Sequence, residues 1–426
     1  MHVDVVIIGG GPAGAAAAIT LRKRPEISVV IIERDGYSVP KIGESLSPGV
    51  RGLLEYLEVW EKFRHSQTLR LFGSEAAWGN DSLGAMDFIL TTHGSGWALD
   101  RQKFDLMLAQ EAECVGATLL SNTKAMQCEF NGTRWQITTE QTQFTARYVI
   151  DAAGRTSQIS LAHGARRQRN DTLTAIYARL PRSSTTPQIS RVQSFENGWW
   201  YAAPLPSDET IVCLFSDAER IHALGLFEPS NWSASLLEAT HISAMLKTPT
   251  SPPKVSAQPA FSGLLQYVQD PVPMIAAGDA MEARDPLSSS GIPNALGGGI
   301  QAARVAADWL FGEGQLRQGY LRSINLDHQA YLSTHWKTYQ IEQRWKDTPF
   351  WRFRSSRVTR IPETLVKSKP SKVSSIFVPQ LIFNWISNAA REPIIQVELA
   401  RTAREAFPGF SDEQLLLAIE EITDTC

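Results

Sequence analysis

The hydrophobic pattern of the chain begins with a continuous apolar run that passes directly into a helix of small residues. Residues 5–8 (VVII) have no polar interruption, which is typical of a parallel strand buried on both faces. The stretch AGAAAAITLRKR that follows predicts a helix, and SVVIIERD predicts a second buried strand. Strand, helix and parallel strand in this order predict an α/β domain built on a parallel sheet.

Downstream of these elements the pattern changes to short strand-like segments. Residues 69–79 and 85–93 predict strands, and residues 96–117 predict a helix that begins near Arg101. A three-stranded meander follows, whose last strand returns to the main parallel sheet: residues 123–130, 134–140 and 143–150.

The segment from Thr172 to Asp217 is again rich in strands and includes NGWWYAAPLP and TIVCLFSD. It predicts a second sheet, inserted between two parts of the α/β domain. After it, an apolar strand ends at Gly278, and a long helix begins near Asn294.

Composition narrows the class of protein. The chain has 426 residues, enough for two or three domains, and its 41 basic and 44 acidic residues give no reason to expect nucleic acid. Cys114, Cys128, Cys213 and Cys426 lie too far apart for a metal site or a disulfide framework, so we expect reduced thiols, the first three in the core. With no leader before the first strand and no apolar run of roughly 18 residues, we expect a soluble, cytoplasmic protein without a membrane span.

Glycines at the first strand-to-helix turn mark a place for a pyrophosphate. Gly9-x-Gly11-x-x-Gly14 matches the dinucleotide fingerprint, in which glycines allow a tight turn, close approach of phosphates and close helix packing. Glu33 ends the second strand about 20 residues later, where a carboxylate can accept both ribose hydroxyls. The remaining cofactor-binding candidates on these elements are Pro12, Ala13 and Arg34.

The late segment AAGDAMEARDPLSSSGIPNALGGG carries a second set of candidates. Asp279, after Gly278 at a strand end, can accept hydrogen bonds from a polyol chain. The helix N-terminus near Gly291 and Ile292 presents free amides that stabilise negative charge, such as the charge of a reduced flavin.

Together these motifs resemble the flavoprotein monooxygenases of the p-hydroxybenzoate hydroxylase fold. The motifs GES at residues 43–45 and DPLSSSGI at 285–292 resemble the branch that contains the flavin-dependent halogenases. The resemblance implies bound FAD, with adenosine near Glu33 and Ala125 and pyrophosphate over residues 11–14. It also implies a cofactor contact at Ser45, the ribityl chain near Arg101 and Asp279, and the flavin ring near Pro286, Gly291 and Ile292.

The fold implied is α/β, a Rossmann-like FAD-binding domain of the glutathione reductase type with an inserted, mainly antiparallel sheet and a helical C-terminal tail. We expect residues 1–170 and 255–310 to form the discontinuous FAD-binding domain. Residues 171–254, with about 65–100, would form the substrate sheet, and residues 311–426 the helical extension.

The resemblance to halogenases is incomplete. Halogenases of this branch carry a lysine after the GES helix, but residues 63–102 contain none, and Ser74 stands near the expected place. Their Trp-x-Trp-x-Ile-Pro motif is replaced by Trp199-x-Tyr201-x-Ala203-Pro204. Hydroxylation of an electron-rich arene by FAD, molecular oxygen and NAD(P)H is therefore the expected activity. A halogenase acting on an indole or pyrrole and an isoprenoid-type saturating flavin reductase are the alternatives.

Candidate substrate and catalytic residues follow from this expectation. Five aromatic residues are candidates for the substrate pocket, with core packing as the alternative: Trp78, Trp97, Trp199, Trp200 and Tyr201. Glu44, His93 and Asp285 are candidates for proton transfer, with solvated loop residues as the alternative.

The segment 339–360 interleaves basic and aromatic residues, including Arg344, Lys346, Arg352, Arg354, Arg357 and Arg360. It could dock a partner, or it could be a helix packed on the domain with its charges in solvent. With NGWWYAAPLP, it resembles the flavin monooxygenases of tryptophylquinone biogenesis, including the one that serves quinohemoprotein amine dehydrogenase. That resemblance implies post-translational hydroxylation of a tryptophan in a partner polypeptide.

Overall fold

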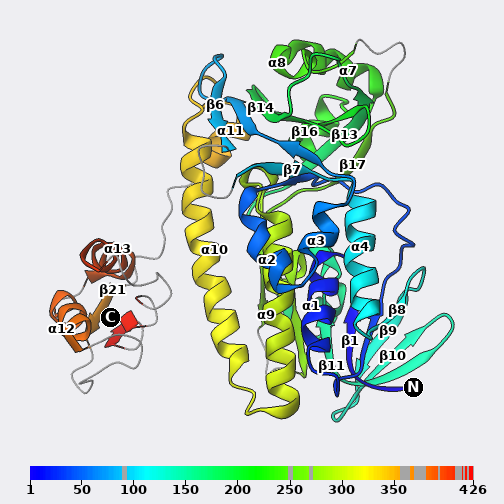
Figure 1. The fold of residues 1–426 in the computed structure, drawn as a ribbon. Helices are drawn as coiled ribbons and strands as arrows, with labels where there is room; N and C mark the ends of the chain where they lie inside the picture. Colours follow the sequence, from blue (N-terminus) through cyan, green and yellow to red (C-terminus); the bar gives the residue numbers. More distant parts are fainter. Residues whose placement is uncertain are drawn as a thin grey trace. The chain divides into compact units, whose positions relative to one another are not determined.

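The computed structural model describes residues 1–88, 94–247, 253–267, 272–355, 365–368, 380–391, 394–407, 415, 418–419 and 422–425. The chain divides into two compact units, Met1–Ser356 and Arg357–Cys426 (Figure 1). The first unit contains two large sheets and the helices packed on them.

The nucleotide sheet of the first unit is built around β1 (His2–Ile8). β1 pairs in parallel with β2 (Val29–Ile32) and β11 (Gln143–Asp151), so that Ile8 lies beside both Ile32 and Asp151. The carboxyl ends of these strands therefore meet at one edge. The sheet continues with β8 (Thr118–Leu120) beside β2, β19 (Met274–Ala276) beside β11, and the antiparallel meander formed with β9 (Ala125–Phe130) and β10 (Trp135–Thr139).

Two helices of small residues pack closely against this sheet. α1 (Pro12–Arg22) lies against α9 (Gly291–Phe311) (Figure 1), and the four alanines at residues 15–18 of α1 are completely buried. A Cβ atom at Gly299 would lie 2.2 Å from the carbonyl oxygen of Ala13, so the two backbones approach more closely than larger side chains permit. α4 (Arg101–Cys114) covers α1, and its solvent side leaves Cys114 exposed, so the expectation that Cys114 lies in the core is wrong.

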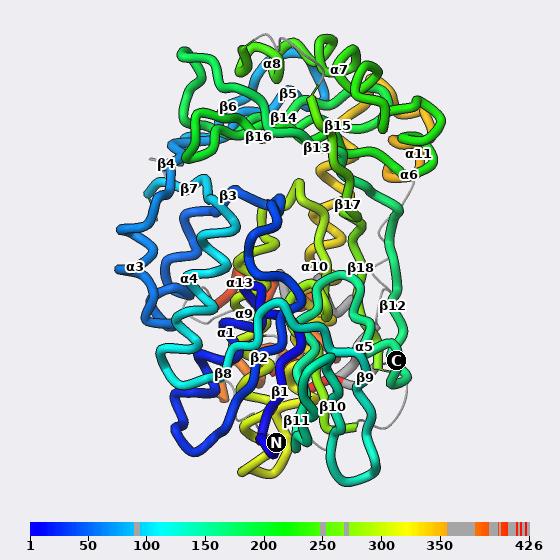
Figure 2. The backbone as a smooth tube through the Cα atoms, turned by 90° about the vertical axis from the view of Figure 1, so that its right-hand side faces the viewer, coloured from blue at the N-terminus to red at the C-terminus, as the bar shows by residue number. Residues whose placement is uncertain are grey.

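The second large sheet has the strand order β17-β13-β16-β15-β14-β5-β6. One of its faces packs on α6 to α8, with Trp200 and Trp232 in the core, and its other face carries Trp199 and Phe215. Figure 2 shows this sheet above the nucleotide sheet. The strands are β5 (Gly73–Ala77), β6 (Gly84–Asp87), β13 (Leu173–Pro181), β14 (Ile189–Phe195), β15 (Gly198–Pro204), β16 (Glu209–Asp217) and β17 (Ser256–Pro259), and the helices are α6 (Ala218–Ala223), α7 (Pro229–Glu238) and α8 (Thr240–Ser243).

Short elements connect these layers. Two small sheets lie beside them: β3 (Ser45–Leu46), β7 (Gly96–Ala98) and β4 (Leu69–Leu71) form one, and β12 (Ala165–Arg169), β18 (Gly263–Tyr267) and β20 (Glu282–Ala283) form the other. The connecting helices are α2 (Arg51–Tyr56), α3 (Trp60–Arg64), α5 (Gln158–Ala162) and the 3₁₀ turns η1 (Pro48–Val50), η3 (Gly154–Thr156), η4 (Gly278–Ala280) and η5 (Pro286–Ser288).

The long helix α10 (Leu316–Gln340) runs alongside α9 and continues into α11 (Pro349–Ser355), which reaches the second sheet (Figure 1). Phe350 and Trp351 are completely buried there, and Arg354 is 1% exposed. The Arg354 guanidinium forms a two-pronged ion pair with Asp217, at 2.8 and 2.9 Å. Arg354 therefore stabilises the fold and does not belong to an exposed basic surface. Arg352 and Lys346 are exposed, whereas Arg357 and Arg360 lie outside the described residues.

The second unit has a small apolar core of its own, which includes Ile386, Leu399 and Ile419. It consists of β21 (Leu365–Ser368), α12 (Gln380–Ala389), β22 (Ile394–Ile395), α13 (Gln396–Ala406) and β23 (Thr423–Thr425), with strand order β22-β21-β23. The finer domain boundaries expected from the sequence stay a prediction. Within the described part of the chain, we find no helix with the length and apolarity that crossing a membrane requires.

The Arg354–Asp217 ion pair gives a test of this architecture. Arg354→Ala leaves the Asp217 carboxylate without its partner at a site largely shielded from water, so we expect the free energy of unfolding to fall by about 3 kcal/mol. Arg352→Ala, two residues away on the exposed side of α11, should change it by about 0.5 kcal/mol or less. Denaturant unfolding followed by tryptophan fluorescence measures both. Equal stabilities of the two variants would contradict the buried placement of Arg354.

Candidate functional site

A cavity of about 450 Å³ lies in the first unit, at the carboxyl edge of the nucleotide sheet and under the inner face of the second sheet. Its wall brings together residues that lie far apart in the sequence, from Ile8 to Ala295. Most of the predicted cofactor-binding residues line it: Gly9, Gly11, Pro12, Ala13, Glu33, Arg34, Ser45, Arg101, Ala125, Asp279, Pro286, Gly291 and Ile292.

The glycine turn between β1 and α1 is shaped by two close backbone contacts. Gly9 has φ +107°, and a Cβ atom there would lie 2.3 Å from the carbonyl oxygen of Ala152. A Cβ atom at Gly14 would lie 1.9 Å from the Gly9 carbonyl oxygen. Gly11 differs, because no atom of the described residues, apart from its chain neighbours, lies within 4 Å of its added Cβ. The space beside Gly11 is therefore open to the cavity, at the N-terminus of α1 where a pyrophosphate is stabilised.

Glu33 occupies the end of β2, beside this turn. Its carboxylate accepts hydrogen bonds from the backbone amides of Gly10 at 2.6 Å and Asp35 at 3.0 Å. These two bonds hold the carboxylate in place, and each oxygen keeps a lone pair for a further donor. A ribose hydroxyl pair fits that requirement.

Arg101 is held at the cavity wall by polar contacts on several sides. Asp100 caps the N-terminus of α4, and the Arg101 guanidinium pairs with Asp105, one turn later, at 3.1 Å. It also donates to the carbonyl oxygen of Ile42 at 2.7 Å. Lys41 pairs with the same Asp105 carboxylate at 3.3 Å. This network places a fixed positive charge beside the GES loop.

The loop that follows β19 forms a second part of the cavity wall. Gly278 has φ +58° and packs on Ala13, so it shapes the wall without lining it, as Gly14 also does. The Asp279 carboxylate lies 2.8 Å from the Arg155 guanidinium and faces the cavity. The N-terminus of α9 at Gly291 lies on the same wall, where its free amides favour an anionic group.

An aromatic wall closes the other side of the cavity. Trp199 stacks on Phe215 with ring centroids 4.0 Å apart and an interplanar angle of 17°. Tyr201 and Cys213, neighbours in the β15–β16 ladder, continue this wall, and the Tyr201 hydroxyl bonds to Ser45 at 2.6 Å. Burial raises the pKa of the Cys213 thiol and of the Tyr201 phenol well above their ordinary values, so both stay protonated.

Among the titratable groups of this wall, Glu44 has unusual hydrogen bonding and an unusual pKa. Its side chain is buried, one carboxylate oxygen accepts the Gly43 amide at 2.8 Å, and the other, Oε1, has no hydrogen-bond partner in the described part of the chain. Burial raises the pKa of Glu44 to about 7, although the nearby Arg101 and Arg179 guanidinium groups oppose this shift. A carboxyl that titrates near neutral pH is suited to proton transfer.

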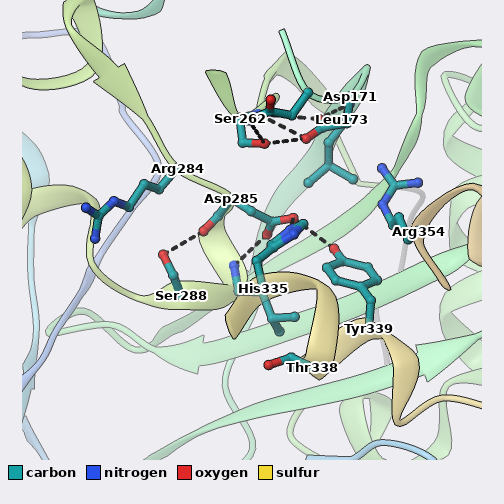
Figure 3. Close-up of polar contacts among 12 residues, drawn as sticks. Asp171, Leu173, Ser262, Arg284, Asp285, Ser288, His335, Thr338, Tyr339 and Arg354 are labelled. Carbon is teal, nitrogen blue, oxygen red and sulfur yellow. Dashed lines mark hydrogen bonds and ion pairs between the residues drawn. The ribbon is translucent and has the colours of Figure 1, made fainter. Parts of the chain in front are cut away.

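Asp285 also lines the cavity wall, but its carboxylate is already occupied. It accepts hydrogen bonds from His335 Nε2, Tyr339 Oη and the amide of Leu287, at 2.9, 2.9 and 2.8 Å (Figure 3). Burial alone would raise its pKa, but the contact with His335 and these bonds hold the pKa below its ordinary value. Asp285 thus connects the loop to α10 and is less available to a substrate than Glu44. His93 lies outside the described residues.

Three of the five predicted pocket aromatics lie elsewhere. Trp97 packs in a cluster with Trp60 and Phe63, and Trp200 faces Trp232 on the opposite side of the second sheet. Trp78 donates its indole N–H to the carbonyl oxygen of Thr338 and packs on Trp351. For these three residues the structure indicates core packing. Trp199 and Tyr201 are the two candidates that line the cavity.

Sequence reasoning missed several cavity residues. Phe215 and Cys213 stand on one face of β16, and the period-two alternation of TIVCLFSD could have indicated them as partners of the residues opposite. Arg155, at the end of the segment DAAGR (residues 151–155), also lines the cavity, and no role was predicted for it from the sequence. The role of His335 and Tyr339 has no local sequence signal, because they meet Asp285 from about 50 residues away.

Comparison with known proteins identifies the family. Residues 2–296 match the family described as FAD binding domain. LodB of Marinomonas mediterranea, named as an FAD-dependent oxidoreductase, is 32% identical over 363 residues, which cover 82% of this chain and 96% of LodB. The flavin-dependent halogenase armH3 of Armillaria mellea is 26% identical over 344 residues, which cover 72% of this chain and 68% of armH3.

Among solved structures, the chain is similar to QhpG, described as a peptidyl tryptophan dihydroxylase essential for tryptophylquinone cofactor biogenesis. The TM-score is 0.71 at 20% identity, over 87% of this chain and 83% of QhpG. This likeness confirms the α/β fold expected from the sequence. The open space at Gly11 and the donors and acceptors around it fit the FAD that the family binds.

The surroundings of Gly11 and Gly14 differ, so substitutions at these two positions test cofactor binding and folding separately. Gly11→Ala adds a methyl group where the protein has room, so we expect normal stability of the cofactor-free protein but loss of bound FAD, because the methyl occupies the phosphate position. Gly14→Ala forces the α1 backbone away from Gly9, so we expect lower stability as well. Absorbance of bound flavin after gel filtration and unfolding curves measure the two effects. Full FAD content in Gly11→Ala would show that the pyrophosphate lies elsewhere.

Proposed function

The chain belongs to the FAD binding domain family, and from this premise we propose that it is a single-component FAD-dependent monooxygenase. It hydroxylates an electron-rich aromatic ring in the cavity between the nucleotide sheet and the second sheet. FAD, reduced by NAD(P)H, supplies an electrophilic oxygen from molecular oxygen, and the residues of this chain bind, orient and deprotonate the substrate.

The observation that carries this proposal is the buried Glu44 carboxyl, which lines the same cavity as the aromatic wall and has one oxygen without a hydrogen-bond partner among the described residues. A buried acceptor without a donor costs about 1–3 kcal/mol, and a ligand that brings an N–H or O–H group removes this cost. Trp199 and Phe215 offer ring surface for an arene next to it. An indole or a phenol combines these two properties, a flat ring and one polar hydrogen.

The catalytic roles follow from the protonation states of the wall. Because Glu44 titrates near pH 7, its ionised form can accept the indole or phenol proton and increase the electron density of the ring. Tyr201 and Cys213 stay protonated, so they contribute shape and hydrogen-bond donors without competing for that proton. Arg101, fixed by Asp105, keeps positive charge on the cofactor side of the cavity.

A tryptophan side chain within a polypeptide is the substrate that we favour. The structural likeness to QhpG supports this choice, since QhpG is described as acting on peptidyl tryptophan. Binding of the peptide on both sides of the indole would then orient the ring, and free tryptophan, which lacks that remote binding energy, would be a poor substrate.

Halogenation is the second candidate, because the relatives include a flavin-dependent halogenase. Two lysines line the cavity in the described part of the chain, Lys41 and Lys124. Lys41 is engaged by Asp105, and Lys124 stands beside Ala125, on the adenosine side of the expected FAD position. Neither belongs to the aromatic wall beside Glu44, and this arrangement favours hydroxylation.

Labelled oxygen distinguishes these activities. With FAD, NAD(P)H, ¹⁸O₂, chloride and bromide present, we expect a tryptophan-containing peptide to gain ¹⁸O and no halogen, and free tryptophan to react poorly. Mass spectrometry of the products measures both atoms. A halogenated product would overturn the hydroxylase proposal, efficient hydroxylation of free tryptophan would overturn the polypeptide substrate alone, and reduction of an alkene without oxygen would indicate a saturating reductase.

A further inference from the structure

A chain of hydrogen bonds joins two residues of the cavity wall, Trp199 and Asp285, through the buried Tyr339. The Trp199 indole N–H donates to the Tyr339 hydroxyl oxygen at 2.8 Å, and the Tyr339 hydroxyl donates to the Asp285 carboxylate at 2.9 Å. Figure 3 shows the Tyr339 ring directed from α10 toward Asp285. All three side chains are buried. The cavity is thus connected to an oxidisable phenol that already contacts a base.

Further aromatic rings extend from Tyr339 away from the cavity. Its ring centroid lies 5.7 Å from that of Trp351 and 5.5 Å from that of Trp78, and Trp351 lies 6.3 Å from the partly buried Trp345. These spacings are short enough for an electron to pass between neighbouring rings. Indole and phenol are also the side chains from which one electron is removed most readily, together with thiols.

The electrostatic surroundings of Tyr339 determine how it can be oxidised. Burial, reinforced by the charge of Asp285, raises its pKa well above the ordinary value, so the phenol keeps its proton at rest. The Arg354 guanidinium lies 5.4 Å from the ring centroid and opposes positive charge on the ring. Loss of an electron from Tyr339 therefore requires simultaneous loss of its proton to a group in contact.

Asp285 meets this requirement. Besides Tyr339, its carboxylate contacts His335 and the Leu287 amide, and the contact with His335 helps to keep it ionised. Two further charged groups lie near this pair: Arg354 and Asp171 both influence Tyr339, and Asp171 also interacts with Asp285. The Asp171 carboxylate is held by Ser262 (Figure 3). The phenolic proton thus has an acceptor at 2.9 Å along an existing hydrogen bond.

We propose that Tyr339 is an internal electron donor to the cavity wall: it returns an electron to Trp199 after Trp199 has been oxidised, and it transfers its phenolic proton to Asp285. The oxidant would be the FAD that this family binds, in its oxidised form and excited by blue light. Trp199 would give one electron to this acceptor, and Tyr339 would then return one electron to Trp199. The electron lost by Tyr339 would thus end on the acceptor and its proton on Asp285, which leaves a neutral tyrosyl radical and balances electrons and protons.

This relay does not depend on the proposed hydroxylation, because it requires only bound FAD and the three side chains. It would move the oxidised site from Trp199, in the cavity wall, to the buried Tyr339. Trp199 and Tyr201, which line the cavity, would thereby be protected from permanent oxidation.

The test compares two tyrosines of α10 in the FAD-loaded protein. After a flash of blue light, we expect wild type to show a neutral tyrosyl radical by transient absorption and electron paramagnetic resonance, with slower formation in D₂O. Tyr339→Phe should lose this signal. Tyr331→Phe is the matched control, because Tyr331 is also buried and its hydroxyl contacts Asp285, but as acceptor of the backbone amide at 2.8 Å. It should keep the signal.

The FAD content and the unfolding midpoint of each variant show whether that variant is folded. If Tyr339→Phe does not bind FAD, Trp199→Phe, which removes the first donor, should abolish the tyrosyl signal in its place. Ring-deuterated tyrosine identifies the radical as tyrosyl by its narrowed spectrum. Persistence of the signal in Tyr339→Phe, equal loss in Tyr331→Phe, or absence of a tyrosyl radical in wild type would each overturn the proposal.

Discussion

One buried carboxylate, Asp285, joins the two large sheets of the first unit. It caps the turn η5 through the Leu287 amide, and it binds His335 and Tyr339 of α10. Tyr339 in turn accepts the indole N–H of Trp199 on the second sheet. The loop that precedes α9 and the aromatic wall are therefore held at a defined separation, and the cavity between them depends on this connection.

Local patterns were sufficient to predict the segments that form the nucleotide-sheet side of the cavity, and the contacts of these residues with FAD stay a prediction. The glycine turn, Glu33 and the GD segment are each recognisable within a few residues, because tight turns and parallel strands impose strict local requirements. The structure brings these segments together at the carboxyl edge of one sheet, and the match to the FAD binding domain family agrees with that prediction.

The substrate half of the site could not be predicted as well, because it depends on which face of a strand is buried against which neighbour. Trp199 and Trp200 are adjacent, so they point to opposite faces of β15, and only the first reaches the cavity. The sequence places Arg354 in a basic segment, yet its partly buried partner Asp217 lies 137 residues earlier in the chain. Such long-range pairs leave no periodic signal in the sequence.

The central claim is that Glu44 exchanges the substrate proton, and its pH dependence tests that claim most directly. Because Glu44 is protonated below about pH 7 and ionised above it, single-turnover hydroxylation should accelerate as the pH rises through that value. Glu44→Gln keeps the acceptor for the Gly43 amide, so we expect intact FAD binding, a rate lower by about 10²–10⁴-fold and no acceleration in this pH range. A Glu44→Gln variant with the wild-type rate and pH profile would contradict the account.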